Sequence, residues 1–204
     1  MDTRSDQFSV TKKFPSESRL HRFLKEVGMA FLFNYCFMVA TEVSVYKGAA
    51  IDRHDLDNHY FIDVAGIGKK YLPYTRDRKI GGPYYFNVSR GIEVKVSRSD
   101  FRSGFVCSGC NYHYLITPMR LINPAELPKW VGLIEYNKHK FNARFRRDYK
   151  FEFQGLRVVK NPQFQETRDF QIEYVTSSIG GRLSSIIKMN LVKTLCKKQG
   201  DEIE

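Results

Sequence analysis

The sequence predicts an α/β (α+β) chain, in which a mixed central sheet is flanked by helices and extended by a β-hairpin and a C-terminal helix. Apolar residues recur at helical spacing near the start of the chain, which is typical of an amphipathic helix. Several later segments alternate apolar and polar residues, as half-buried strands do. The helical stripe consists of Leu20, Phe23, Leu24, Val27 and Phe31.

The predicted elements follow one another along the chain. Pro15 and Ser16 open the first helix. Strands are predicted at 38–46, 59–66, 91–97, 112–117 and 131–136, and short helices or turns at 99–105 and 120–129. In the first strand, Val39, Val43 and Val45 should share one face. Segment 47–58 should be an irregular loop, and 68–89 a basic insertion that forms either an irregular loop or an extra hairpin.

The last third of the chain is expected to add two features. Residues 140–159 are predicted to form an antiparallel hairpin that turns near Gln154 and Gly155. A final helix should occupy residues 166–198, with a break at Gly180 and Gly181. The whole chain, 1–204, is predicted to be one domain with a polar tail at 1–13 and a basic hairpin and helical extension at 138–204.

Composition limits the classes of protein to consider. The 204 residues are 42% hydrophobic and 14% aromatic, which favours a folded core over disorder. No apolar run reaches the length of a membrane span. The segment Met1–Lys13 is polar and charged, with no apolar signal core, so we expect a cytoplasmic protein (in the host cytoplasm if a phage encodes it).

The charge balance favours an anionic partner. The chain has 33 basic and 22 acidic residues, a net charge of +11, which predicts affinity for nucleic acid before anionic membranes. Residues 138–160 contain eight basic and two acidic side chains, and residues 69–79 contain five basic and one acidic. The candidate nucleic-acid-binding residues are Lys69, Lys70, Arg76, Arg78, Lys79, Arg98, Arg144, Arg146 and Arg147.

The segment from Gly91 to Asp100 carries the strongest chemical signal. Its alternation places Glu93 and Lys95 on one face of a strand and apolar residues on the other. A carboxylate beside an ammonium can bind a divalent cation and orient an attacking water. Asp63, at the end of an earlier predicted strand, supplies a second carboxylate. The competing interpretation of Glu93 and Lys95 is a solvated sheet face.

These residues give the chain a resemblance to a known superfamily. Asp63 followed by Glu93-Val94-Lys95 resembles the pattern of the PD-(D/E)XK, or restriction-endonuclease-like, nucleases. The wider context is similar to the MmcB-like DNA-repair branch: a Ser-x-x-Asp-Phe helix start at 97–101, a Cys-Asn-Tyr strand ending in Pro at 110–118, and Leu-Pro-x-x-Val-Gly-Leu-Ile at 127–134. The resemblance implies an αβββαβ core and a DNA endonuclease in phage or bacterial repair, recombination or replication.

The resemblance also implies roles for individual residues. Asp63, Glu93 and the backbone carbonyl of Val94 would hold Mg²⁺ or Mn²⁺, and Lys95 would act on the attacking water. A further acid often comes from the first helix in this superfamily. Glu17 is the first choice, Glu26 and Glu42 are rivals, and a surface role for Glu17 is equally compatible with the sequence. Asp100 is expected to cap or steady the start of the next helix.

The cysteines and the basic surface each allow a second interpretation. Cys107, Cys110 and His113 have half the spacing of a zinc site, but a structural zinc takes four ligands, so plain thiols are expected. The chain could be a non-catalytic nucleic-acid-binding accessory protein with the nuclease fold, or a module that binds an acidic protein. Cutting both strands of a duplex would call for two sites, and hence favour a homodimer.

Overall fold

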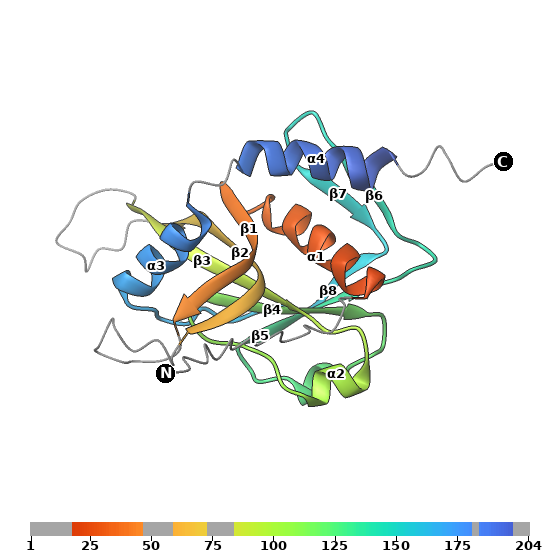
Figure 1. Ribbon diagram of the computed structural model, residues 1–204, viewed down its shortest axis with the longest axis horizontal. Coiled ribbons are helices and arrows are strands. Elements are labelled where there is room, and N and C mark those ends of the chain that lie inside the picture. Colours follow the sequence, from red (N-terminus) through yellow and green to blue (C-terminus); the bar gives the residue numbers. More distant parts are fainter. Residues whose placement is uncertain (1–17, 47–58, 73–83, 181–183, 198–204) are drawn as a thin grey trace, which may run out of the picture.

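The computed structural model describes residues 18–46, 59–72, 84–180 and 184–197. The helices are α1 (Arg19–Leu32), α2 (Arg98–Arg102), the 3-10 turn η2 (Pro124–Glu126), α3 (Asp169–Ile179) and α4 (Ser184–Lys197). The strands are β1 (Met38–Tyr46), β2 (His59–Leu72), β3 (Tyr84–Val94), β4 (Tyr112–Pro118), β5 (Val131–Tyr136), β6 (Asn142–Phe145), β7 (Phe151–Gln154) and β8 (Leu156–Lys160). The predicted α/β class, with a mixed sheet flanked by helices, is confirmed (Figure 1).

Six strands form the main sheet in the order β1-β2-β3-β4-β5-β8. The pairs β1–β2, β2–β3 and β5–β8 are antiparallel, whereas β3–β4 and β4–β5 are parallel. The parallel strands β4 and β5 read as apolar runs because both of their faces are covered. Strands β6 and β7 form a separate two-stranded sheet.

Helix α1 packs its apolar stripe on one face of the main sheet. Ser18 begins the helix by accepting a hydrogen bond from the N–H of His21 at 3.1 Å, which satisfies one of the free amides of the first turn. Leu24 and Val27 are fully buried in a core that includes Val64 and Ile92 of the sheet. Helix α4 contributes to the same core and lies beside α1 and the β6–β7 pair (Figure 1).

The opposite face of the sheet is covered in two parts. Val175 and Ile179 of α3 pack on Ala40 and Ala65 of strands β1 and β2. Further along the sheet, residues after β3, including Phe101 of α2, pack on strands β4 and β5. Because neighbouring residues of a strand point to opposite faces, α1 and α3 sandwich the β1–β2 part of the sheet.

The predicted alternation in β1 is wrong past its middle. Val39 packs with the core under α1, whereas Val43 and Val45 pack with the core under α3. The cause lies at Glu42, whose φ of 52° is in the left-handed region. A single residue in this conformation changes the direction of the side chains that follow it.

Of the two expectations for residues 68–89, the described ends of the segment fit the hairpin and not the irregular loop. Strand β2 continues to Leu72 and β3 starts at Tyr84, and the two pair in register, with Gly68 opposite Val88 and Lys69 opposite Asn87. Strand three therefore spans Tyr84–Val94 rather than residues 91–97. The sequence hides this pairing because Gly68, Lys69 and Lys70 lower the apparent strand propensity on the β2 side.

The hairpin predicted at 140–159 divides differently. Strands β6 and β7 pair across a turn in which Arg146 N–H donates to the Lys150 carbonyl at 2.8 Å. Gly155, with a φ of 69°, then leads into β8, which joins the main sheet beside β5. A side chain at Gly155 would lie 2.6 Å from the backbone of Lys140, so this sharp turn needs glycine.

The C-terminal segment contains two helices where the sequence predicted one broken helix. Helix α3 ends at Ile179, directly before Gly180, and α4 starts at Ser184. The break at the glycines is thus confirmed as far as the described residues reach. Among the helices described, none combines the length and the apolar character that spanning a bilayer requires.

Candidate active site

Asp63 lies where strands β2 and β3 part. The ladder between them ends at the pair Val64 and Ile92. Beyond that pair, the N–H of Val94 donates to Oδ2 of Asp63 at 2.8 Å. The side chain of Asp63 thus takes the place of a strand partner and reaches the backbone of the Glu-x-Lys segment. The sequence-predicted acid and the sequence-predicted pair are therefore neighbours.

Two basic side chains from α1 face the carboxylate of Asp63. Nζ of Lys25 is 3.3 Å from Oδ1, and Nε2 of His21 is 3.6 Å from Oδ2. His21 and Lys25 are four residues apart, so they project from the same face of the helix. Burial alone would raise the pKa of Asp63, but the hydrogen bonds from His21 and Val94 and the charges of His21 and Lys25 lower it below its ordinary value.

Lys25 also connects Asp63 to a second acid. The Lys25 side chain is only 10% exposed, and its ammonium pairs with the carboxylates of both Glu42 and Asp63. Glu42 is the residue with the left-handed backbone in β1. Backbone strain of this kind often accompanies functional sites. Glu42, one of the three acids considered beside Asp63 and Glu93, is thus linked to Asp63 through Lys25, whereas Glu17 lies outside the described residues.

Glu93 is a buried carboxyl group with an unused oxygen. The residue is 8% exposed, and its Oε1 has no hydrogen-bond partner among the described residues. Burial, and next the negative charge of Asp63, raise the pKa of Glu93 to about 8, against the opposing effect of Lys95. The solvated sheet face considered for Glu93 is therefore wrong. A buried, unpaired carboxyl group is costly, and a cation would remove that cost.

Lys95 is held beside Glu93 by the start of α2. The residue is 9% exposed, and its Nζ lies 3.2 Å from Oδ1 of Asp100. Oδ2 of Asp100 accepts a hydrogen bond from the N–H of Val96 at 3.0 Å, and the N–H of Asp100 donates to Ser97 at 3.1 Å. These contacts fix Asp100 as the residue that steadies the helix start, as predicted, and give the ammonium a defined position.

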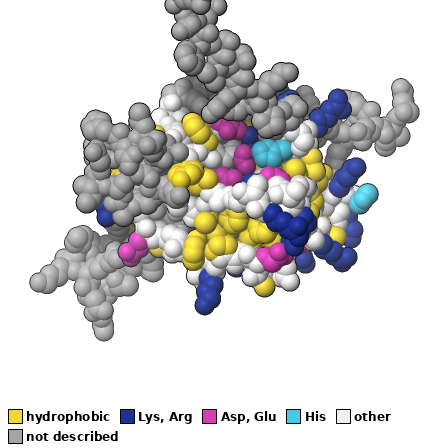
Figure 2. All heavy atoms as spheres, turned by 60° about the horizontal axis from the view of Figure 1, so that its bottom comes forward, with side chains coloured by type: hydrophobic (Ala, Val, Ile, Leu, Met, Phe, Trp, Pro, Cys, Tyr) yellow, Lys and Arg dark blue, Asp and Glu magenta, His cyan; other side chains and the backbone are white. Residues whose placement is uncertain are grey.

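The candidate nucleic-acid-binding residues are dispersed. Arg76, Arg78 and Lys79 lie outside the described residues, Lys69 is exposed on β2, and Arg144 and Arg147 are exposed near the β6–β7 turn. Two of the remaining residues have internal partners, because Arg98 pairs with Glu126 at 2.9 Å and Arg146 with Asp148 at 3.4 Å. Figure 2 shows acidic side chains beside a histidine on one face of the molecule, with basic side chains on the same face.

Lys70 belongs to an aromatic group on the sheet. Its ammonium lies 4.3 Å from the ring centre of Phe164 and 5.5 Å from that of Tyr112. The guanidinium of Arg90 lies 5.2 Å from the Tyr112 ring on the same strand surface. These contacts are favourable cation–π interactions, so Lys70 is partly committed to the structure.

The cysteine cluster does not assemble a set of metal ligands in the described residues. Cys107 and Cys110 are free thiols, and Nε2 of His113 accepts a hydrogen bond from the backbone N–H of Cys110 at 3.1 Å. Burial lowers the pKa of His113 to about 4. Within the described ranges, no group of three or more histidine, cysteine, aspartate or glutamate side chains is placed to hold a metal.

His21 and Lys25 have no role in the site that the sequence predicts. A signal was nevertheless present, because Lys25 interrupts the apolar stripe of α1 between Leu24 and Val27. A lysine at a buried position needs an acidic partner inside the fold. The partner, Asp63, lies 38 positions further along the chain, so the sequence alone could not identify it.

Comparisons with known proteins do not place this chain in a family. No family model matches it, and no curated protein matches it. A solved structure of a protein of unknown function from Silicibacter pomeroyi aligns over 81% of this chain and 84% of its own, with 17% identity and a TM-score of 0.37. A likeness this distant supports no conclusion about fold or function.

Proposed function

We propose that this protein is a metal-dependent nuclease of the PD-(D/E)XK type that hydrolyses phosphodiester bonds of DNA. The observation that carries the proposal is the meeting of Asp63 and Glu93 where β2 and β3 part, with Lys95 held beside them. The chain order α1-β1-β2-β3-α2-β4 also agrees with the core that the sequence resemblance implies. A role in phage or bacterial DNA repair, recombination or replication follows from the resemblance alone.

The donor set fits a hard divalent cation such as Mg²⁺ or Mn²⁺. Asp63 and Glu93 supply carboxylate oxygens, and one Glu93 oxygen is buried and unused by the described residues. The N–H of Val94 points to Asp63. Because the N–H and C=O of a strand residue point to the same side, its carbonyl is directed there too. All three are oxygen ligands of the kind such ions prefer.

A divalent cation bound at these oxygens would supply positive charge that stabilises the developing negative charge on the phosphate. Lys95 would orient the attacking water and stabilise a phosphate oxygen, with Asp100 keeping its ammonium in position. Lys25 and His21 would set the orientation of Asp63. Lys25 would also offset the charge that accumulates when Glu93 ionises.

The surface charge supports nucleic acid as the substrate. The net charge of +11 favours binding to a polyanion. Exposed basic residues flank the sheet at Lys69 and at the β6–β7 turn near Arg144 and Arg147. The binding should therefore weaken steeply as salt concentration rises, because counterion release drives contacts with phosphates.

The decisive experiment is incubation of the purified protein with supercoiled plasmid and with short oligonucleotides, in Mg²⁺, Mn²⁺ or chelator. We expect cleavage with either metal and none in chelator. Glu93→Gln should abolish it, whereas Glu152→Gln, which changes an exposed glutamate of β7, should not. Cleavage by Glu93→Gln at the wild-type rate would contradict the proposal.

A direct measurement of metal binding distinguishes a protein that binds metal without cleaving DNA from one that has no metal site. Calorimetric titration with Mn²⁺ should show one site in the wild type and none in Glu93→Gln. If the wild type binds DNA with steep salt dependence but binds no metal and cuts nothing, the chain is instead a non-catalytic nucleic-acid-binding protein.

A further inference from the structure

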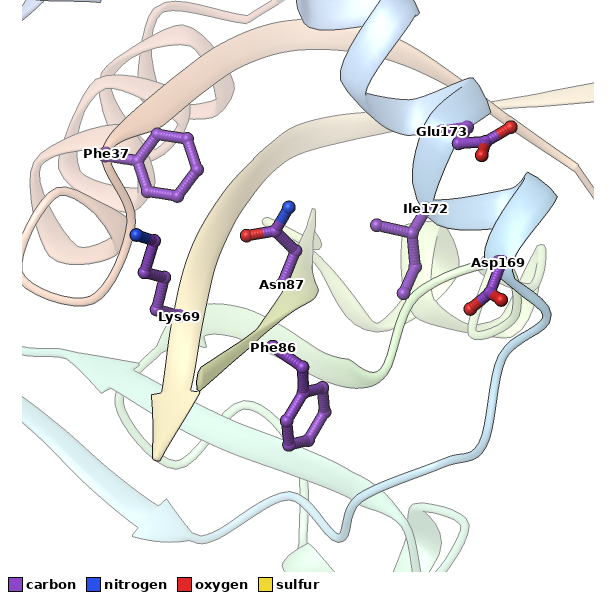
Figure 3. A pocket seen from close by; sticks show the side chains of 7 residues that line it. All are labelled: Phe37, Lys69, Phe86, Asn87, Asp169, Ile172 and Glu173. Atoms are coloured by element: carbon purple, nitrogen blue, oxygen red, sulfur yellow. The ribbon is translucent and has the colours of Figure 1, made fainter. Parts of the chain in front are cut away.

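A large hollow lies between the β2–β3 hairpin and the start of α3. Its volume is about 960 Å³, within the range of small-molecule sites. Lys69 and Asn87 line it from neighbouring strands, where they are register partners. Ile172 faces Asn87 from α3, and Phe37 closes the side next to Lys69 (Figure 3).

The lining combines aromatic rings with polar groups of both kinds. Phe37 is 53% exposed, so its ring is available for contact. Phe86 also contributes to the lining, but its ring points away from Asn87 (Figure 3) and packs edge-on against that of Phe164, with ring centres 6.2 Å apart. The ammonium of Lys70 lies above the Phe164 ring of that pair. Phe37 is thus the exposed ring of the lining, whereas Phe86 packs against Phe164.

The charged groups of opposite sign lie on opposite sides of the hollow. Lys69 is the cation on the strand side, and Asp169 is a carboxylate on the α3 side. In Figure 3 the carboxylate of Glu173 points away from Asn87. A ligand with a phosphate at the strand side and amino or hydroxyl donors at the helix side would satisfy both walls. The amide of Asn87, which can donate and accept, stands between them.

A nucleotide has this distribution of groups. Its base can stack on an aromatic ring, its edge can hydrogen-bond to an amide and a carboxylate, and its phosphate can pair with a lysine. The surrounding chain is strongly basic, so nucleic acid is the source of nucleotides that its charge attracts.

Asn87 of the hollow and Glu93 of the candidate active site lie on the same face of β3. Asn87 and Glu93 are six residues apart, and side chains two, four and six positions apart share a face. The distance along the strand is about 20 Å, or about six steps of duplex rise. A bound strand could thus reach both places at once.

We infer that this hollow binds an unpaired nucleotide of a nucleic-acid strand, with the base against Phe37 and Asn87 and the phosphate at Lys69. The inference rests on the proposed nuclease function and deepens it by naming the substrate class, single-stranded or locally unpaired DNA. Duplex DNA without unpaired bases can contact only the basic surface, because its stacked bases cannot enter the hollow.

Binding assays in chelator test the inference without relying on cleavage. The probe is a short single strand carrying a fluorescent adenine analogue, compared with the same strand in a duplex. Phe37→Leu and Asn87→Ala should each weaken single-strand binding about ten-fold, the usual effect of losing one base–aromatic or base–amide contact. Duplex binding should not change. The matched control is Phe61→Leu, which removes an exposed ring of β2 that does not line the hollow.

The two variants and the control give distinguishable results. Selective loss of single-strand binding in both variants, with the thermal unfolding temperature unchanged, supports the inference. Equal losses for single strand and duplex, losses no larger than in Phe61→Leu, or tighter binding of free deoxyadenosine monophosphate than of the strand would overturn it. Absence of cleavage in Mg²⁺ with selective single-strand binding would remove the nuclease function and leave the nucleotide site.

Discussion

Glu93 of β3 and Leu115 of β4 are register partners in the parallel part of the sheet, yet their energetic roles are opposite. Leu115 is fully buried and packs with Leu133 of β5, which stabilises the fold by about 2 kcal/mol. Glu93 is almost as buried, but one of its oxygens has no partner in the described structure. Nearly equal burial thus stabilises the fold at Leu115 and destabilises it at Glu93. A destabilising residue at a core position indicates a functional requirement.

The largest expected effect is a loss of the proposed activity without a change in the fold. Glu93→Gln should reduce metal-dependent cleavage about a thousand-fold, because it removes a carboxylate from the proposed cation site while preserving volume. The rate of nicking of supercoiled plasmid in Mg²⁺ measures this. DNA affinity in chelator should stay within about two-fold, because phosphate contacts elsewhere dominate it.

Leu115→Ala should show the opposite profile. It leaves a cavity between β4 and β5 and should lower the free energy of unfolding by about 4 kcal/mol. Denaturant unfolding at neutral pH measures it. A loss below about 1 kcal/mol would mean that the sheet around Leu115 is loosely packed. The residual folded fraction should cleave at the wild-type rate per folded molecule.

The burial of His113, also on β4, should make the stability of the protein depend on pH. Its pKa is 6.5 ordinarily and about 4 in the fold, so above pH 6.5 it is neutral in both states and contributes no pH dependence. As pH falls from 6.5 to 4, the unfolded chain takes up a proton that the folded chain does not. Stability should therefore fall by up to about 3 kcal/mol from this group.

The matched variant for this measurement is His113→Gln, which keeps a side-chain acceptor for the backbone N–H of Cys110. Between pH 6.5 and 4 its free energy of unfolding should fall less steeply with pH than that of the wild type. The difference in slope should correspond to nearly one proton taken up on unfolding. Parallel curves for the two proteins would show that His113 does not carry this dependence.

The smallest expected effect is a gain in stability. In chelator, Glu93→Gln should raise the free energy of unfolding by about 1 to 2 kcal/mol at pH 9, because the wild type must ionise a buried carboxyl group there. The raised pKa of about 8 fixes the sign: the penalty is absent below the ordinary value of 4.5 and grows as pH rises to 8. The gain should therefore vanish at pH 4, and a gain independent of pH would have another cause.

Strand alternation placed Glu93 and Lys95 side by side in the sequence, and the family resemblance joined Asp63 to them. The structure brings the three residues together, while their catalytic role stays a prediction. His21 and Lys25 could not be predicted, because their relation to Asp63 depends on where α1 lies over the sheet. The change of direction at Glu42 was equally hidden, since its left-handed backbone is imposed by the fold and not by its own preference.

Among the strands, too, some could be predicted from the sequence and others could not. The strands β1, β4 and β5 were predicted close to their observed bounds, although the alternation expected in β1 does not hold. The extension of β2 and β3 through Gly68 and Lys69 depends on cross-strand pairing, which single-strand propensity does not contain. The separation of β8 from the β6–β7 hairpin is a choice between two partners, and only the packed sheet decides it.

The hydroxyl of Ser178 on α3 accepts a hydrogen bond from the N–H of Ser44 at 3.0 Å, and Tyr174 contacts the Ser44 hydroxyl. Helix α3 thereby occupies the outer border of β1, where an incoming strand would otherwise attach. Of the two borders of the main sheet, only β8 at the far side then stays available to extend the ladder in the part of the chain described. A dimer that continues the main sheet from one copy to the next would then pair its β8 strands, and this would fix how two of the proposed catalytic sites face a duplex.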